Sequence, residues 1–123
     1  MPRFVILEHD HPNLHWDLML ESGGVLRTWR LLQSPETRGP IEAEAIGDHR
    51  PQYLHYEGPV SGGRGSVKRW DGGEYTLVLE SPDRLEIQFA GARLSERCLL
   101  EQAVDGSRWS LHRLNEPSTP SPT

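Results

Sequence analysis

Two histidines and an aspartate lie within nine residues near the start of the chain, and their types and spacing could bind a metal. They are His9, His15 and Asp17. Apolar and polar residues alternate from Leu14 to Glu21, as in a half-buried β-strand, so His15 and Asp17 would share one face. A short turn could bring His9 back beside them. Two imidazoles and one carboxylate make an open site for a divalent transition metal, and such open sites are usually catalytic rather than structural.

A plainer interpretation of the same segment is a solvated surface turn. The histidine-rich sequence Glu8–His11 is typical of such turns, and alternation alone carries no chemistry. His11 is either a fourth metal ligand or a surface loop residue, and its place in a turn favours the second. On the predicted strand, Met19 joins the polar face. The opposite face would point into the core and holds Leu14, Trp16, Leu18 and Leu20.

Length and composition indicate one domain over residues 1–114. The chain has 123 residues, of which 35% are hydrophobic and 25% charged, which is enough to bury a core. No apolar run is long enough to cross a bilayer, so we expect no membrane partner. The start, Met1–Glu8, is too short and too soon acidic for a signal peptide and is predicted to be a first strand. The single Cys98 is expected to be a buried thiol, and the protein to be cytoplasmic.

The net charge argues against broad, non-specific binding to nucleic acid. It is −5, with a pI of about 5.6, whereas such binding needs a basic surface. A small active site that takes one phosphate remains compatible with this charge, because a bound metal ion would supply positive charge.

Short segments of period two dominate the rest of the chain and predict an all-β, mainly antiparallel fold with little helix. About eight or nine strands at near-regular spacing are typical of a barrel or a sandwich. Ile41–Ile46 fits either a strand or a helical turn. The other predicted strands are Val25–Leu32, Tyr53–Tyr56, Ser66–Trp70, Tyr75–Leu79, Leu85–Phe89, Arg93–Glu101 and Ser107–Leu114.

Glycine, proline and small polar residues mark the connections between these strands. Residues 61–65 form a glycine-rich loop without the Gly-Lys-Ser/Thr continuation of a phosphate loop, so we interpret it as a mobile loop beside the site. The Pro/Ser/Thr segment 115–123 is predicted to be disordered. The other predicted turns and loops are Ser22–Gly24, Ser34–Pro40, Gly47–Pro51, Asp71–Gly73 and Asp105–Gly106.

His49 is a second candidate for chemistry. It stands in an Asp-His-Arg-Pro turn, where a histidine is commonly a surface residue, and Tyr53 and His55 would share one face of the following strand. The tryptophans could stack nucleic-acid bases, but most of them fall on apolar strand faces, which favours packing. They are Trp16, Trp29, Trp70 and Trp109.

Six short motifs follow one another in a specific order along the chain. They contain a His-x5-His-x-Asp core and a later Asp-His-x3-Tyr, and they read Phe4-Val5-Ile6-x-Glu8-His9, Leu14-His15-x-Asp17-x-x-Leu20-Glu21, Gly24-Val25-Leu26-x-x-Trp29, Asp48-His49-x-x-x-Tyr53-x-x-x-Glu57-Gly58, Trp70-Asp71-x-Gly73-x-Tyr75 and Trp109-Ser110-Leu111. In this order they resemble the phosphoesterase domain family of bacterial DNA ligase D over roughly Phe4 to Leu114. Here the domain would stand alone.

The resemblance implies a small β-barrel that trims 3′ ends of DNA with manganese. Members of that family remove a terminal ribonucleotide by phosphodiester cleavage and a remaining 3′-phosphate by monoester cleavage. By resemblance, His9, His15 and Asp17 are expected to bind Mn²⁺, or another divalent ion such as Zn²⁺ or Co²⁺. His49 would contact the scissile phosphate as general acid or transition-state stabiliser, and Tyr53 would help to place it. The implied partners are DNA 3′ ends and a DNA ligase or repair polymerase.

The chain departs from the family pattern at two phosphate-binding arginines. Met19 and Ile41 occupy the positions at which the family has these arginines. Arg30 or Arg38 could substitute from nearby, and His55 is a weaker substrate-binding candidate. Hydrogen bonds to charged groups stabilise by roughly 1.5–3 kcal/mol each, so losing two would cost several kcal/mol of transition-state binding.

Three functions therefore remain open at the level of the sequence. The first is a manganese-dependent 3′-phosphoesterase acting on nucleic-acid ends in DNA repair. The second is a metal-binding relative that has lost catalysis and serves as a binding module. The third is a metallo-hydrolase of a small phosphoester. Salt dependence separates the first from the third, because only turnover of a nucleic acid should fall steeply with added salt.

Overall fold

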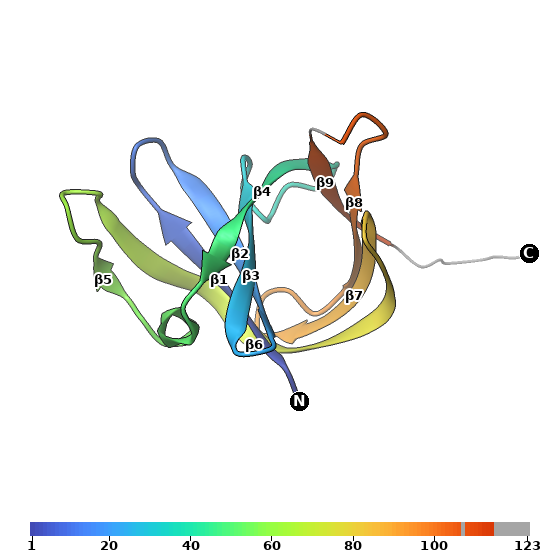
Figure 1. Cartoon of the computed structure of the whole chain (residues 1–123), viewed down its shortest axis with the longest axis horizontal. Coiled ribbons are helices and arrows are strands. Elements are labelled where there is room, and N and C mark those ends of the chain that lie inside the picture. The colour runs from blue at the N-terminus through green and yellow to red at the C-terminus, as the bar shows by residue number, and fades with distance from the viewer. Residues whose placement is uncertain (107, 115–123) are drawn as a thin grey trace, which may run out of the picture.

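The computed structural model of the chain describes residues 1–106 and 108–114 (Figure 1). The predicted tail, 115–123, lies outside the described residues. The strands and the single short helix of the described part are β1 (Arg3–His9), β2 (His15–Ser22), β3 (Val25–Leu31), β4 (Ile41–His49), the 3-10 helix η1 (Pro51–Leu54), β5 (Gly58–Pro59), β6 (Ser66–Ser81), β7 (Arg84–Gly91), β8 (Arg97–Gln102) and β9 (Trp109–Arg113).

The long strand β6 closes the sheet into a barrel. Neighbouring strands are antiparallel in the order β1-β2-β3-β4-β9-β8-β7-β6, and β1 also pairs with β6, which completes a ring of eight strands. The first half of β6 pairs with β1, and its second half pairs with β7. The two-residue β5 adds to the free edge at the start of β6, outside the ring (Figure 1). The all-β barrel predicted from the sequence is confirmed.

The inside of the barrel is one apolar core. Every ring strand contributes residues two positions apart, which is the spacing of a single strand face. Examples are Phe4 and Ile6 of β1 and Leu85 and Ile87 of β7, all at most 1% exposed. The tryptophans also pack here: Trp29 and Trp109 meet edge to face with ring centroids 5.6 Å apart, and Trp16 and Trp70 lie against the cluster. Packing by the tryptophans and burial of the Cys98 thiol are thus confirmed.

A second apolar cluster, which we call the outer cluster, covers the outside of the β1–β2–β3 wall. It comprises Val5, Leu7, Met19, Leu26, Leu54 and Val67, with Tyr53, Tyr56 and Val60 packed against it. These residues join the barrel wall to η1 and to the start of β6, which lie to the left of the ring in Figure 1. As a result, β1 and β2 are buried on both faces.

Burial on both faces corrects the prediction that β2 is a half-buried strand with one polar face. His15 and Asp17 are each 4% exposed, and Met19, 1% exposed, packs in the outer cluster with Leu54 of η1 and Val67 of β6. The predicted core position of Leu14 is wrong as well: this side chain is 52% exposed, because β2 begins only at His15.

Residues Asp71–Gly73 were predicted as a hairpin turn and instead lie within β6. The buried Asp71 carboxylate accepts hydrogen bonds from the backbone N–H groups of Ala92, Arg93 and Leu94 at 3.0, 3.0 and 2.7 Å. A Cβ at Gly73 would overlap the carbonyl oxygen of Ala90 on β7. The Asp-Gly-Gly sequence therefore supports the β7–β8 connection and close strand contact rather than a turn.

The segment around Tyr53 is helical rather than extended. The predicted strand Tyr53–Tyr56 is wrong: Pro51 opens the 3-10 helix Pro51–Leu54, since its fixed φ suits the first helical position. Tyr53 and His55 therefore do not share a strand face. Ile41–Ile46 is a strand, which continues to His49 and shortens the predicted turn after it. The predicted strand Arg93–Glu101 begins only at Arg97.

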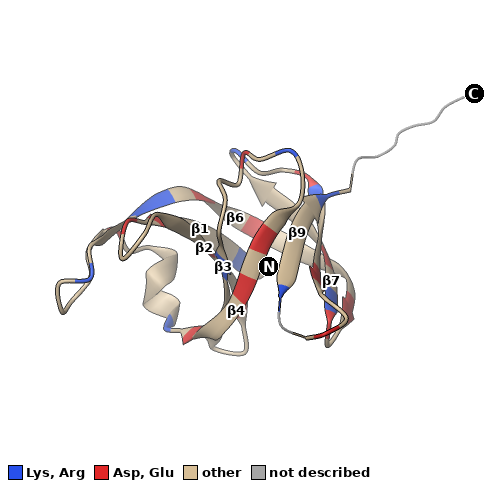
Figure 2. Ribbon diagram, turned by 90° about the horizontal axis from the view of Figure 1, so that it is seen from above, with Lys and Arg blue, Asp and Glu red and all other residues tan. Residues whose placement is uncertain are grey.

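Charge is distributed unevenly over the strands. The start of β4 carries Glu42 and Glu44, whereas the first half of β6 carries the exposed Lys68 and Arg69, seen as red and blue segments in Figure 2. Lys68 and Arg69 therefore lie on β6, directly after Val67 of the outer cluster. Among the described residues, the structure has no helix with the length and apolar character needed to span a membrane.

Candidate metal centre and catalytic cavity

The strand pairing of β1 with β2 brings His9, His15 and Asp17 together. His9 lies directly opposite His15 in the β1–β2 ladder, and Asp17 follows two residues later on the same face. The two imidazole rings meet edge to face with centroids 4.8 Å apart. One ligand atom from each of the three residues lies within 4.8 Å of the others. The predicted cluster therefore forms from one hairpin.

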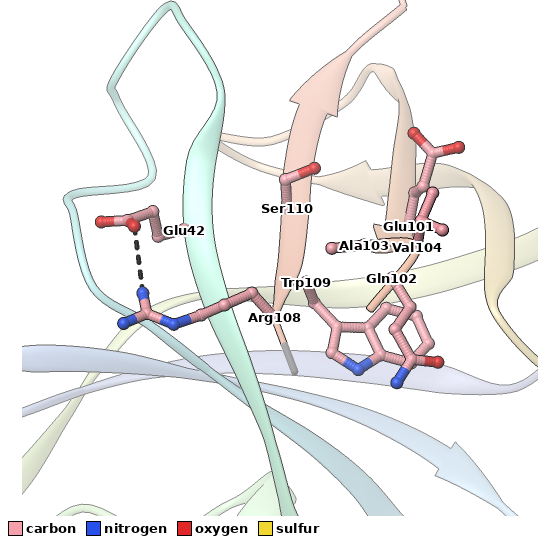
Figure 3. Close-up of a pocket in the computed structure, with 8 residues that line it drawn as sticks. All are labelled: Glu42, Glu101, Gln102, Ala103, Val104, Arg108, Trp109 and Ser110. Carbon is pink, nitrogen blue, oxygen red and sulfur yellow. Dashed lines mark hydrogen bonds and ion pairs between the residues drawn. The ribbon is translucent and has the colours of Figure 1, made fainter. Parts of the chain in front are cut away.

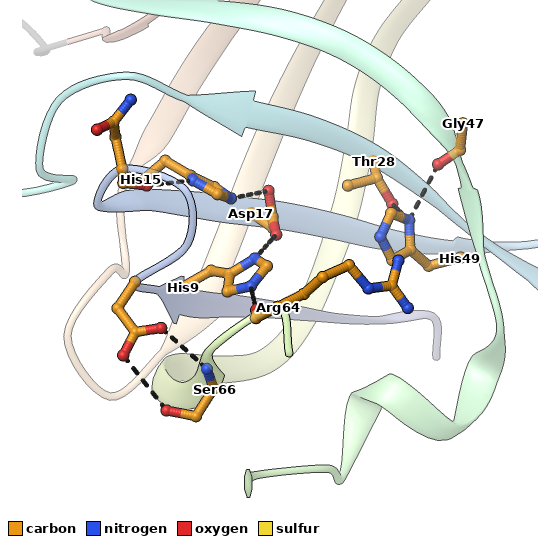
Figure 4. A network of polar contacts seen from close by, with 10 residues as sticks. His9, His15, Asp17, Thr28, Gly47, His49, Arg64 and Ser66 are labelled. Carbon is orange, nitrogen blue, oxygen red and sulfur yellow. Dashed lines mark hydrogen bonds and ion pairs between the residues drawn. The ribbon is translucent and has the colours of Figure 1, made fainter. Parts of the chain in front are cut away.

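Backbone carbonyls orient both imidazoles toward the aspartate. The Nδ1 of His15 donates to the carbonyl oxygen of Asn13 at 2.8 Å, and the Nε2 of His9 donates to that of Arg64 at 2.8 Å. In the neutral rings, the lone pairs are therefore on Nε2 of His15 and Nδ1 of His9. These two atoms lie 3.5 and 3.8 Å from the two oxygens of Asp17 (Figure 4).

The buried atoms of this cluster lack partners of their own. His15 Nε2 and Asp17 Oδ1 are both buried and accept or donate no hydrogen bond. The Asp17 carboxylate raises the pKa of His15, against the opposing effect of burial. A lone pair facing a carboxylate oxygen is stabilised by a cation between them, either a proton on the imidazole or a divalent metal with two His and one carboxylate ligand. The second ring nitrogen of each ligand bonds a carbonyl, as metal-binding histidines commonly do.

The cluster opens into a cavity of about 270 Å³. His9 and Asp17 line one part of this cavity, and His49 and Tyr53 line another, so the two constellations recognised in the sequence belong to one site. His11 also lines the cavity. The remaining walls are formed mainly by side chains of the outer cluster and its neighbours, including Leu7, Met19, Ile46, Val60 and Val67.

Thr28 fixes the orientation of His49. The Thr28 hydroxyl donates to the carbonyl oxygen of Leu26 at 2.9 Å, so its oxygen is left to accept from His49 Nδ1 at 3.1 Å. The carbonyl oxygen of Gly47, 3.0 Å from the same nitrogen, is a second acceptor (Figure 4). His49 therefore carries a proton on Nδ1 and has Nε2 available for a ligand. The ring of Tyr53 packs edge-on against it, with centroids 5.7 Å apart.

The glycine-rich loop 61–65 lies beside the cluster, as predicted, and hydrogen bonds hold it there at Arg64 and at the residue that follows the loop, Ser66. Besides the His9–Arg64 bond, Asp10 Oδ1 accepts a hydrogen bond from the backbone N–H of Ser66 at 2.9 Å, which lowers the pKa of Asp10. Gly65 has a φ of +72°, and a Cβ there would overlap Oδ1 of Asp10. The predicted mobility of this loop stays a prediction.

Comparison with known proteins identifies the family. The family described as DNA Ligase D 3′-phosphoesterase domain matches residues 7–102. The chain belongs to this family. The match spans strands β1 to β8 and includes every residue of the candidate centre.

Three LigD proteins illustrate how similar the relatives are. The multifunctional non-homologous end joining DNA repair protein LigD of Mycobacterium tuberculosis is 32% identical over 120 residues, which is 90% of this chain and 16% of that protein. The LigD of Mycolicibacterium smegmatis is 30% identical over 98% of the chain and 18% of its own length. The LigD of Pseudomonas aeruginosa is 30% identical over 92% of the chain and 13% of its own length. The chain thus spans less than a fifth of each of these relatives.

The two positions where the LigD family arginines were expected have apolar surroundings in this chain. Met19 belongs to the outer cluster and lines the cavity, whereas Ile41, 2% exposed, points into the barrel core. Among the predicted substitutes, Arg30 of β3 lines the cavity opposite Asp17, and its Nε is buried without a hydrogen-bond partner. Arg38 and His55 are exposed and do not line the cavity.

Sequence reasoning missed two residues of the site. Thr28 shares the period-two face of β3 with Arg30, and this spacing was the signal that could have found it. Arg64 also lines the cavity. The sequence predicted that the loop containing Arg64 lies beside the site, but nothing in the sequence indicated that Arg64 itself contacts His9.

A second hollow, of about 460 Å³, lies between the start of β4, the end of β8 and the start of β9 (Figure 3). Trp109 and Val104 supply apolar surface there, and an ion pair of 3.0 Å between Glu42 and Arg108 borders it. It shares no lining residue with the cavity beside His9 and His49 and contains no cluster of metal-binding side chains among the described residues.

Proposed function

We propose that this chain is a manganese-dependent phosphoesterase that removes 3′-terminal ribonucleotides or 3′-phosphates from DNA ends. The observation that carries the proposal is the meeting of two constellations in one cavity. His9 and Asp17 lie on one side of it and His49 and Tyr53 on the other. Membership of the LigD 3′-phosphoesterase family supports the reaction class.

The proposed metal ligands are His9 Nδ1, His15 Nε2 and a carboxylate oxygen of Asp17. Their fit rests on the orphaned buried atoms of His15 and Asp17 and on the two carbonyls that orient the imidazoles. When bound, Mn²⁺ would neutralise charge on the phosphoryl oxygens and bring a water to the phosphorus. Zn²⁺ and Co²⁺ suit the same donor set, so the identity of the metal is a matter for measurement.

His49 is proposed as the general acid. In its protonated form, Nδ1–H is held by Gly47 and Thr28, so Nε2–H is the proton that can be given away. As the bond between phosphorus and the leaving oxygen breaks, this proton passes to that oxygen and leaves a neutral imidazole. Tyr53, which packs on the ring, would hold it in place and line the path of the leaving group.

Arg30 is proposed as a substrate-binding residue. Its buried Nε lacks a partner, and its side chain lines the cavity directly across the ladder from Asp17. A guanidinium group in this position can donate to a phosphoryl oxygen. Because the relative is named for end joining in DNA repair, we further propose that the reaction prepares 3′ ends for extension by a repair polymerase or sealing by a DNA ligase.

The proposal is tested with a primer–template duplex that ends in one ribonucleotide and with the same duplex ending in a 3′-phosphate. Wild type with Mn²⁺ is compared with His9→Ala and His49→Ala. We expect cleavage by the wild type alone and unchanged Mn²⁺ binding in His49→Ala. Loss of Mn²⁺ binding in His49→Ala would make His49 a ligand instead. Mn²⁺ binding by the wild type without any cleavage would favour a binding module or a small phosphoester as substrate.

A further inference from the structure

Arg64 contacts the candidate centre through its backbone and also lines the adjoining cavity. Its carbonyl oxygen accepts the hydrogen bond from His9 Nε2 at 2.8 Å, and its side chain lines the catalytic cavity (Figure 4). The same residue of the glycine-rich loop thus orients a proposed metal ligand and presents a positive charge to the space where the substrate would bind.

The guanidinium of Arg64 is held in one orientation. Its Nε donates to the carbonyl oxygen of Ser61 at 2.8 Å, and its Nη2 donates to the hydroxyl of Ser61 at 3.2 Å. A guanidinium has five N–H donors, so three remain for a ligand. Among the described residues, Arg64 takes part in no ion pair, whereas six other arginines pair with glutamates: Arg27, Arg84, Arg93, Arg97, Arg108 and Arg113.

The charge of the cavity favours an anion. Among the residues that line it, Arg30 and Arg64 are cationic and Asp17 is the acidic one, and the charge of Asp17 is committed to the proposed metal. Arginine presents a planar fork of donors that matches a phosphate, and hydrogen bonds between charged groups are about twice as strong as neutral ones.

We propose that Arg64 binds the phosphate of the substrate and that the glycine-rich loop couples this contact to the metal site through His9. The inference rests on the proposed function and adds a phosphate-binding residue to it. Because His9 bonds Arg64 within the loop and Asp10 bonds Ser66 directly after it, metal bound at His9 would favour the loop position that presents Arg64. By linkage, phosphate would then raise the affinity for metal by the same factor as metal raises that for phosphate.

The side-chain contact is tested by calorimetric titration of the Mn²⁺-loaded protein with inorganic phosphate. Arg64→Ala is expected to bind phosphate about ten- to a hundredfold more weakly, the range for losing one hydrogen-bonded charge pair. Arg64→Lys should lie between the two, because lysine keeps the charge without the fork. Arg38→Ala is the matched control, since Arg38 is exposed and does not line the cavity. Mn²⁺ affinity should stay unchanged in Arg64→Ala, because the carbonyl that orients His9 remains.

The coupling is tested with a pair of glycine variants. Gly63 and Gly65 have similar φ values, +68° and +72°, so both bear a similar backbone strain on substitution. A Cβ at Gly63 meets nothing within 4 Å, whereas one at Gly65 would overlap Asp10 Oδ1 and lie 2.7 Å from Cβ of His11. Gly65→Ala should therefore displace the loop and weaken both Mn²⁺ and phosphate binding, while Gly63→Ala should weaken neither by more than about twofold.

The outcomes separate this inference from the proposed function. Phosphate binding that is equal in wild type and Arg64→Ala, or absent in wild type, overturns the role of Arg64 whether or not DNA ends are cleaved. Equal effects of Gly63→Ala and Gly65→Ala overturn the coupling. Weakened phosphate binding in Arg64→Ala, together with an inactive wild type, would support the phosphate site and refute the phosphoesterase.

Discussion

Removal of one proposed metal ligand, His15→Gln, gives the sharpest check on the metal centre, because it needs no substrate. His15 is 4% exposed and its Nε2 has no hydrogen-bond partner, so the wild type should gain stability when a metal fills that gap. A ligand at a hundredfold excess over its Kd stabilises the folded state by about 2.7 kcal/mol. With an unfolding entropy of about 2.1 cal/mol/K per residue, the 123-residue chain should show a rise in Tm of about 10 °C.

The assay is thermal unfolding followed by circular dichroism at increasing Mn²⁺ concentration, after prior treatment with a chelator. Glutamine keeps the polarity of histidine but lacks the oriented ring nitrogen, so we expect a Tm shift of at most about 2 °C in His15→Gln at the same Mn²⁺ concentration. His55→Gln is the control, because His55 is exposed and outside the cavity, and it should keep the full shift. A wild type that does not respond to Mn²⁺, Zn²⁺ or Co²⁺, or an equal shift in His15→Gln, would refute the metal site.

The pH dependence of the same experiment has a definite sign. Asp17 raises the pKa of His15 above its ordinary value of 6.5 in the folded, metal-free protein. When a group has a higher pKa in the folded state than in the unfolded state, its protonation stabilises the folded state. This stabilisation is complete at a pH below the unfolded-state pKa and is lost as the pH rises through the folded-state pKa. The metal-free wild type should therefore lose stability relative to His15→Gln over that window. Mn²⁺ must displace the proton on His15 in order to bind. The Mn²⁺-induced shift in Tm should therefore shrink as the pH falls below the pKa of His15 in the folded protein.

Three further predictions concern residues around the centre and in the barrel. Thr28→Val removes one of the two acceptors of His49 Nδ1. It should lower kcat on a 3′-phosphate end about fivefold, which corresponds to the loss of one neutral hydrogen bond of about 1 kcal/mol. Mn²⁺ binding, measured by titration, should be unchanged. Asp71→Ala leaves three backbone N–H groups of the β7–β8 connection without their acceptor and should cost about 3 kcal/mol in urea unfolding; a loss below about 1 kcal/mol would mean that water replaces the carboxylate. Burial raises the pKa of Cys98 to about 12, so Ellman's reagent should react at pH 8 only at the rate of unfolding, and rapid labelling of the native protein would contradict this.

The sequence was sufficient to predict the hairpin that carries the proposed metal ligands. His15 and Asp17 are two residues apart, and this spacing places them on one face of any strand. The return of His9 beside them depended only on a short connection, and the ladder pairs His9 with His15 as that connection requires. Local spacing fixes local geometry, so this part of the site needed no tertiary information.

The rest of the site depends on contacts between residues far apart in sequence. Arg64 reaches His9 across 55 positions, and Thr28 reaches His49 across 21. The residue pattern within each of these segments does not indicate which distant residue it contacts. The wrong prediction for Asp71–Gly73 has a similar cause. An Asp-Gly-Gly sequence favours a turn, but here the carboxylate binds the backbone of a distant loop and Gly73 makes room for β7. Tertiary contacts overrode a correct local propensity.

Burial of β1 and β2 on both faces has a consequence for how the chain finds its correct strand pairing. Phe4–Leu7 is apolar at every position, so sliding β1 by one residue would exchange Phe4 and Ile6 for Val5 and Leu7 with little loss of apolar burial. The hydrophobic pattern of this strand therefore does not distinguish the native pairing from its nearest competitor.

The polar residues at the strand ends make that distinction. The slipped pairing would turn His9 toward the apolar interior of the barrel and away from Asp17, leaving a polar group without a partner. His9, His15 and Asp17 thus help to specify the register of β1 against β2 during folding, besides being available for chemistry. Apolar replacements at these positions would make the strands more hydrophobic but would leave the register of β1 against β2 less well specified. The residues of the site therefore also contribute to a unique fold.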